Sequence, residues 1–314
     1  MDLVRIVFLG TPAFAVPSLR ALAERFQVVG VVTQPDRPAG RGRRLQPPPV
    51  KAVSQELVLP LLQPDRIASP EAVSALAAWA PDLIVVAAFG QILRRPVLDL
   101  PPRGCLNVHA SLLPRWRGAS PIQHAVLHGD SETGVTLMGM NEGLDTGPIL
   151  ARRVLPIRDD HTAASLEQEL ADIGAQLLVE SLPAYLAGDL RPVAQDERFA
   201  TYAPRLKRVD GLLDARQTAQ ELQRRVRALN PRPGTYLPWD DTELMVLTAR
   251  AEEESPGEPP GTVAERGGFP ALATASGWLI LERLQLPGKK PVDGIAFLRG
   301  RPRLRGASLA VSSN

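Results

Sequence analysis

Short apolar runs alternate with amphipathic stretches over residues 1–189, and this alternation limits the folds that the chain can adopt. The apolar runs span residues 4–9, 28–32, 83–88, 106–108 and 135–138. Stretches with helical periodicity lie between them, such as 71–79 and 122–128. Buried strands separated by helices are typical of a parallel sheet that helices cover on both faces. We therefore expect an α/β domain with a doubly wound, mainly parallel sheet.

A second pattern begins after residues 190–208, which show little periodicity and which we interpret as a linker. Asp214 and Gln217 have the spacing of a capping pair for a helix that ends before Pro231. Short β-type runs at 243–247, 272–274 and 278–281 follow, with turns rich in Gly and Pro. This pattern predicts a smaller β-barrel domain over residues 209–314.

Length and composition agree with two globular domains, because 314 residues allow two at roughly 100 to 200 residues each. No apolar run approaches the roughly 18 residues of a membrane span. Residues 1–10 are too short and too weakly basic for a signal peptide. The single cysteine, Cys105, excludes an internal disulfide, so we expect a protein of the reducing cytoplasm.

Two polar side chains, Asn107 and His109, occur at the end of an apolar run that breaks into a turn. Alternate side chains of a strand point to the same face, and an amide donor beside an imidazole can hold an oxyanion while a proton moves. Asp145 lies in a turn bracketed by Gly143 and Gly147, which would bring its carboxylate to the imidazole. Each residue also has a purely structural interpretation, as a core histidine or a loop carboxylate. Together they suit acyl transfer.

Three motifs resemble, in order and spacing, those of the folate-dependent formyltransferases. They are Asn107-x-His109, the run Ser111-Leu-Leu-Pro-Arg-Trp-Arg-Gly118, and Leu144-Asp-Thr-Gly147. The segment 33–42 and a further domain after residue 205 make the chain most similar to the members that act on a tRNA-bound amino acid. The resemblance runs nearly from end to end. It implies an oligonucleotide-binding-like barrel, which would bind tRNA, as the second domain.

The resemblance also implies a reaction: a formyl group passes from 10-formyltetrahydrofolate, the cosubstrate, to the α-amine of methionine on initiator tRNA, for translation initiation. Asn107 and His109 would stabilise the charge on the formyl oxygen. Asp145 would orient His109 and help to remove the amine proton. The folate site would include Phe89, Gly90, Gln91, Leu93, Ser111, Leu112, Leu113 and Pro114. No metal is expected.

Residues 34–49 carry five prolines and two glycines, which predicts an exposed loop that contains neither strand nor helix interior. In the family that the chain resembles, this loop reaches the end of the tRNA acceptor arm, and Arg41, Arg43 and Arg44 would bind there. A solvated surface loop is the alternative. Near the C-terminus, arginines recur at alternate positions from 299 to 305. On an extended segment they would point to one side and form a row of cations that binds phosphates.

Other readings stay open at this point. His124 and His128 have i, i+4 spacing that could seat zinc, but no third ligand is evident. The turn after the first strand lacks the glycines of a dinucleotide site, which disfavours a nicotinamide cofactor. A formyltransferase that acts on an amino sugar or a glycinamide nucleotide is the nearest rival, and a non-catalytic RNA-binding protein is another. We expect a monomer with no membrane partner.

Overall fold

The computed structural model describes residues 4–39 and 44–309, and of Ala39 and Arg44 the backbone alone. The chain forms two compact units. The first comprises residues up to 121 together with 132–156 and 167–203. The second comprises 122–131, 157–166 and the residues from 204 onward. The domain limits expected from the sequence, 1–189 and 209–314, stay a prediction.

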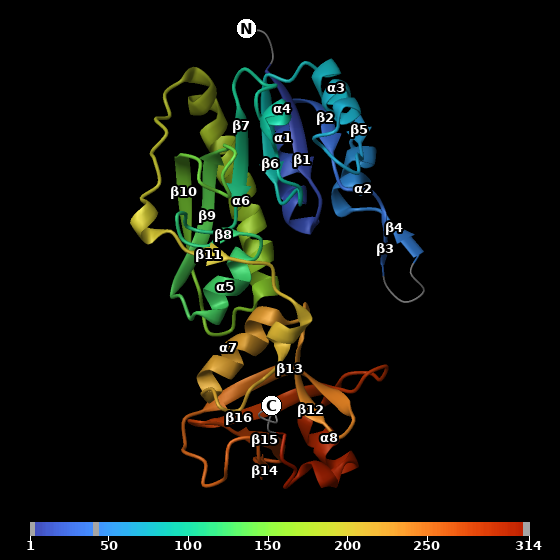
Figure 1. Ribbon diagram of the computed structural model, residues 1–314, viewed down its shortest axis with the longest axis vertical. Coiled ribbons are helices and arrows are strands. Elements are labelled where there is room, and N and C mark those ends of the chain that lie inside the picture. Colours follow the sequence, from blue (N-terminus) through green and yellow to red (C-terminus); the bar gives the residue numbers. More distant parts are fainter. Residues whose placement is uncertain (1–3, 40–43, 310–314) are drawn as a thin grey trace. The chain divides into compact units, whose positions relative to one another are not determined.

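The first unit is built on a seven-stranded sheet (Figure 1). In spatial order its strands are β10 (Ile149–Pro156), β9 (Glu132–Gly139), β7 (Cys105–His109), β6 (Leu83–Ala87), β1 (Arg5–Gly10), β2 (Gln27–Val32) and β5 (Leu61–Leu62). The five strands from β7 to β5 are parallel to one another, whereas β9 runs antiparallel to both of its neighbours, β7 and β10. The mainly parallel sheet is thus confirmed. Because antiparallel neighbours need only a short connection, residues 140–148 join β9 to β10 and carry Asp145.

Helices connect these strands, and two of them lie where the periodicity predicted helices, at 71–79 and 122–128, whereas the helices at 49–56 and 95–98 were not predicted. The helices are α1 (Val16–Arg25), α2 (Pro49–Glu56), α3 (Pro70–Ala78), α4 (Arg95–Leu98), α5 (Pro121–Leu127) and α6 (Ala163–Ala187). Ser69 caps α3 by accepting a hydrogen bond from the Ala72 N–H. The side chain of Val108 in β7 lies against Gly174 of α6. Since side chains alternate along a strand, Asn107 and His109 point to the other face of the sheet.

The segment predicted to be an irregular loop contains a small antiparallel ladder. Strands β3 (Arg37–Ala39) and β4 (Arg44–Gln46) pair with each other, with Pro38 opposite Leu45. The expectation that prolines exclude a strand here was wrong, because a two-stranded ladder has only edges, and an edge position tolerates a residue without an N–H. Arg41 and Arg43 lie outside the described residues, as does the side chain of Arg44.

The second unit holds α7 (Ala219–Leu229) and a barrel-like antiparallel sheet, as predicted. Its strands are β12 (Thr235–Trp239), β13 (Thr242–Glu252), β16 (Trp278–Gln285), β15 (Phe269–Ala273) and β14 (Val263–Arg266), with β17 (Val292–Asp293) beside β16. Leu222 and Val226 of α7 belong to the core of this unit. The capping prediction was wrong: Thr218 caps α7 in a reciprocal box with Glu221, because Asp214 binds its own neighbour Arg216.

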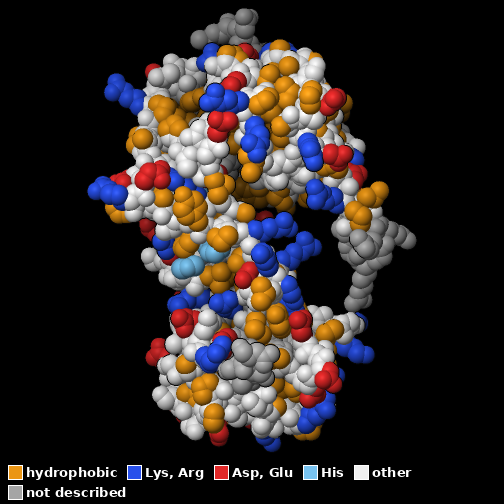
Figure 2. Space-filling model, viewed as in Figure 1, with side chains coloured by type: hydrophobic (Ala, Val, Ile, Leu, Met, Phe, Trp, Pro, Cys, Tyr) orange, Lys and Arg blue, Asp and Glu red, His pale blue; other side chains and the backbone are white. Residues whose placement is uncertain are grey.

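The arginines from 299 to 305 do not form the expected row on one side of an extended segment. Their segment is not extended but folds into α8 (Gly294–Gly300) and a 3₁₀ turn, η4 (Pro302–Leu304). Arg303 pairs with Asp240 and lies over the Trp239 ring, while Arg305 pairs with Glu265. On the lower part of the face drawn in Figure 2, basic and acidic side chains are interspersed.

The remaining elements are short: η1 (Ala13–Ala15), β8 (Arg117–Gly118), η2 (Glu197–Phe199), β11 (Tyr202–Ala203) and η3 (Arg208–Gly211). β8 and β11 form a two-stranded parallel ladder in the first unit. Of the helices that the structure describes, none combines the length and the apolar character that crossing a membrane requires.

Candidate active site

Asn107 and His109 lie at the carboxyl end of β7, near the centre of the sheet. Asn107 is opposite Val86 on β6 and Met138 on β9, and His109 is opposite Thr136 on β9. His109 is buried, whereas Asn107 is partly exposed. Among residues 4–39 and 44–309, none forms a hydrogen bond with the Asn107 side chain. Its amide is therefore available to donate to a bound group on the face that it shares with His109.

The β9–β10 connection brings Asp145 to His109. The distance from Nδ1 of His109 to Oδ2 of Asp145 is 3.7 Å, and the aspartate side chain is 16% exposed. The same Oδ2 accepts a hydrogen bond of 2.8 Å from the Gly118 N–H. The carboxylate is thus held beside the imidazole without a direct hydrogen bond to it, which leaves Nδ1 open to a proton or a water molecule.

The other ring nitrogen fixes the orientation of His109. Its Nε2 lies 3.0 Å from the carbonyl oxygen of Trp116. Because a carbonyl only accepts, Nε2 is assigned the hydrogen and donates it. Trp116 adopts a left-handed backbone conformation, with φ of +63°. This turn thus holds one ring nitrogen, while Asp145 lies beside the other.

The predicted folate segment Ser111–Pro114 is a tight turn held by Thr136 of β9. The Thr136 hydroxyl donates to the Ser111 carbonyl at 2.6 Å and accepts from the Leu113 N–H at 3.1 Å. The Leu113 side chain is fully buried in a cluster with Met138 and Ile149. Leu112 and Pro114 are partly exposed. Ser111 and Leu113 therefore stabilise the turn, and the two partly exposed residues are the ones that a ligand can reach.

The other predicted folate segment, Phe89–Leu93, follows β6 at the same edge of the sheet. The Phe89 carbonyl accepts a hydrogen bond of 2.8 Å from the Thr11 hydroxyl. Gly90 is exposed with φ of +86°, while Phe89 and Leu93 are buried. The Gln91 side chain is engaged with the Ile67 N–H and the Pro64 carbonyl. What this segment exposes to a ligand is accordingly backbone at Gly90 and the side chain of Ile92.

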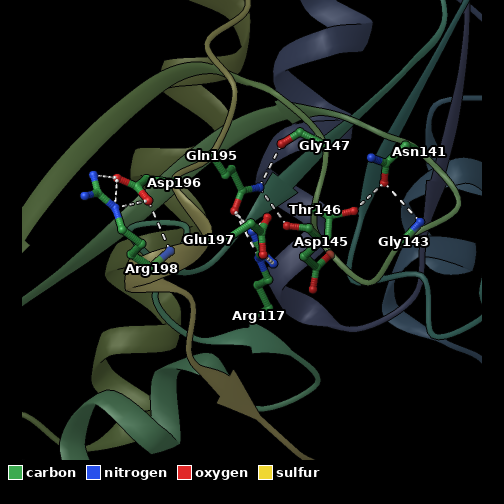
Figure 3. A network of polar contacts seen from close by, with 10 residues as sticks. All are labelled: Arg117, Asn141, Gly143, Asp145, Thr146, Gly147, Gln195, Asp196, Glu197 and Arg198. Carbon is green, nitrogen blue, oxygen red and sulfur yellow. Dashed lines mark hydrogen bonds and ion pairs between the residues drawn. The ribbon is translucent and has the colours of Figure 1, made fainter.

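The structure shows a network of polar contacts next to Asp145 that the sequence did not predict (Figure 3). Arg117 is fully buried, and its guanidinium donates to Gln195 and Glu197. The hydrogen bond from Arg117 keeps the pKa of the Glu197 carboxyl below its ordinary value. Gln195 and Glu197 lie in the stretch interpreted as a linker, where no periodicity or motif indicated a role. Residues of that stretch belong to the first unit as far as Ala203.

Three further side chains with possible chemistry have structural roles. Burial raises the pKa of the Cys105 thiol to about 12, so this cysteine is a packing residue and not a nucleophile. The His124 and His128 rings stack at 5.7 Å, and Nε2 of His124 lies 3.3 Å from the Pro204 carbonyl. In the part of the chain that the structure describes, no group of three or more His, Cys, Asp or Glu could hold a metal ion.

An amide donor, an imidazole and a carboxylate at the carboxyl edge of a doubly wound sheet are typical of an enzyme that transfers an acyl group. The family comparison is more specific. Residues 4–182 match the formyl transferase family, and residues 205–302 match the formyl transferase C-terminal domain. The chain belongs to the formyl transferase family.

Relatives and solved structures agree with this assignment. The methionyl-tRNA formyltransferase of Halorhodospira halophila is 53% identical over 96% of this chain and 98% of its own length. The sugar 3N-formyl transferase WlaRD, solved with dTDP and 5-N-formyl-THF, has a TM-score of 0.68 at 17% identity, covering 92% of this chain and all of its own. HypX from Aquifex aeolicus, solved with tetrahydrofolic acid, has a TM-score of 0.64 at 23% identity, covering 95% and 47%. The two structures establish the fold alone.

Proposed function

We propose that this protein transfers the formyl group of 10-formyltetrahydrofolate to the α-amine of methionine esterified to initiator tRNA. The observation that carries this proposal is the 53% identity to a methionyl-tRNA formyltransferase over 98% of that relative's length, with both family domains matched. The product, N-formylmethionyl-tRNA, serves translation initiation.

Three side chains act on the reacting atoms in this proposal. The neutral amine attacks the formyl carbon, and negative charge develops on the formyl oxygen. The free amide of Asn107 donates to that oxygen, and His109, which lies beside Asp145, stabilises the same charge. The C–N bond to the amine forms and the bond to N10 of the folate breaks. The proton lost by the amine passes through water toward Asp145 and is returned to N10, which leaves protonated.

The folate binds at the ends of β6 and β7. These strands are parallel neighbours, so Phe89–Leu93 and Ser111–Pro114 follow them at one edge. The pterin lies against backbone at Gly90, and the remainder of the site includes Leu112 and Pro114. No metal takes part, and the folate is a cosubstrate.

The tRNA is bound by the loop that contains Arg41, Arg43 and Arg44 and by the second unit. Cations on a chain segment neutralise phosphates and release counterions, so affinity falls with salt. Arg41→Ala is expected to weaken tRNA binding and to lower the slope of log affinity against log salt by about 1. Folate binding should stay unchanged. We also propose that the protein is a cytoplasmic monomer.

A direct experiment distinguishes this substrate from its rivals. The purified protein is incubated with 10-formyltetrahydrofolate and with methionyl initiator tRNA, methionyl elongator tRNA, an amino-sugar nucleotide or glycinamide ribonucleotide. We expect formylation of the initiator tRNA in preference to the other three. Faster formylation of a small amine would overturn the proposed substrate, and the absence of any formylated product would leave an RNA-binding protein without this activity.

A further inference from the structure

The β9–β10 connection holds Asp145 in a conformation that needs support. Asp145 has φ of +53°, in the left-handed region that side chains other than glycine rarely adopt. Such a residue persists only where its surroundings determine it. A Cβ on Gly147 would collide with the Gly139 carbonyl, so the end of the connection lies directly against β9. The support must therefore come from the contacts of residues 145–147.

Gln195 supplies those contacts. Its Nε2 donates to the carbonyl oxygens of both Asp145 and Gly147, at 2.7 Å each. Its Oε1 accepts from Nε and Nη2 of Arg117, at 3.0 and 2.8 Å. Figure 3 shows the amide between the guanidinium and the connection. A separate pair of hydrogen bonds holds the start of the connection. The side-chain oxygen of the exposed Asn141 accepts one from the Gly143 N–H and one from the Thr146 hydroxyl.

The direction of the Gln195 amide is fixed by its partners. A guanidinium only donates, so the oxygen of the amide faces Arg117 and the NH₂ group faces the two carbonyls. Glutamate has the same shape and would satisfy Arg117, yet it cannot donate to a carbonyl. Asparagine is one methylene shorter and cannot reach both ends. The contacts thus require glutamine at this position.

We infer that Gln195 is a positioning residue for formyl transfer, which it serves by holding the backbone of Asp145 so that the carboxylate faces His109. This inference rests on the proposed function for its kinetic consequence. The residue lies in the segment that leads out of the first unit, so the last part of that unit takes part in building the site. Arg117 acts as the buried anchor, joined to Glu197 as well as to Gln195.

The Gly118 amide reports the position of Asp145 without any assay of activity. Its N–H donates to Asp145 Oδ2, whereas the neighbouring Ala119 N–H donates to the Ala203 carbonyl at 2.9 Å. Amide hydrogen exchange of the full-length protein measures both. In Gln195→Ala and Gln195→Glu we expect protection of Gly118 to fall about 10-fold or more while Ala119 keeps its protection. Unchanged protection of Gly118 in both variants would overturn the inference.

Kinetics provide the second test. Displacing a catalytic group by about 1 Å costs on the order of 100-fold, so kcat should fall about 10- to 100-fold in both variants, with KM for folate and tRNA nearly unchanged. If Gln195 served only to satisfy Arg117, Gln195→Glu would keep full activity, and that result would also overturn the inference. Gln176→Ala is the matched control, because Gln176 meets Arg153 on the surface and does not touch the connection. If the wild-type protein formylates no tRNA, the proposed function fails, and the Gly118 exchange still decides the role of Gln195.

Discussion

Arg117 in the first unit and Arg303 in the second both pair with a carboxylate, but the two units use them differently. The Arg117 side chain is 0% exposed and joins Glu197 and Gln195 behind the candidate active site. The Arg303 side chain is 73% exposed, where it pairs with Asp240 and lies over Trp239. A buried cation needs all its partners in place, whereas an exposed pair is screened by solvent and exchanges partners readily. Arg117 thus positions other atoms of the first unit, whereas Arg303 keeps its charge at the surface of the second.

The largest effect is expected where the positioned atoms meet the substrate. Asn107→Ala and His109→Ala should each lower kcat by about 100- to 1,000-fold, because one donor to a developing oxyanion contributes roughly 3–4 kcal/mol. The unfolding midpoint of Asn107→Ala should stay near that of the wild type, since the Asn107 amide makes no hydrogen bond with any residue that the structure describes. Full activity in either purified variant would rule out the assigned roles.

Removal of the buried cation should come next. Arg117→Ala leaves a cavity and an unsatisfied Gln195 oxygen, while Glu197 is 69% exposed and turns to solvent. We expect a loss of about 2–3 kcal/mol in the free energy of unfolding, from cavity and hydrogen-bond terms. Urea denaturation measures it. If the free energy of unfolding fell no more than it does on removal of the exposed Arg303, the distinction between the buried and the exposed arginine would be lost.

A smaller change is expected on acidification, and it comes from the second unit. Burial lowers the pKa of His124 below its ordinary value of 6.5, so the unfolded chain binds a proton more readily than the folded one. The free energy of unfolding should therefore decrease as the pH falls below about 6.5. Paired carboxylates such as Glu197 have lowered pKa values and lose their contribution only at more acidic pH. His124→Asn should flatten the slope between pH 6.5 and 5, and an unchanged slope would assign it to other groups.

The smallest effect is expected for the exposed pair. Arg303→Ala should change the free energy of unfolding by less than about 1 kcal/mol, because exposed ion pairs contribute little. Denaturation in the same series as Arg117→Ala gives the comparison directly. A loss equal to that of Arg117→Ala would show that the exposed pair is as structural as the buried one.

The main strands and helices were predictable because they leave local signals, whereas the roles of the site residues stay predictions. The β7 run predicts a strand, and the alternation of Asn107 and His109 places them on one face, as the register shows. The antiparallel pairing of β9 and β10 was not predicted, because an apolar run does not specify the direction of a strand relative to its neighbours in the sheet. The capping pair was misplaced, since Asp214 and Thr218 both have favourable sequence contexts and only the fold shows which one binds the helix.

The network around Gln195 could not be predicted. Its members are distant in sequence, and a glutamine in a stretch without periodicity has no local signature of a buried partner. For the arginines from 299 to 305 a pattern was present but misleading. Their regular spacing was interpreted as an extended segment, whereas the segment folds into α8 and η4. Long-range hydrogen bonds and the handedness of connections are properties of the folded chain, and single-sequence patterns do not report them.

The structure of the protein with 5-formyltetrahydrofolate bound tests the central claim most directly. We predict that the pterin lies against the backbone of Phe89–Leu93, with the formyl group facing the Asn107 amide and His109. A pterin bound elsewhere, with Asn107, His109 and Asp145 left facing solvent, would contradict the assignment of these residues to formyl transfer.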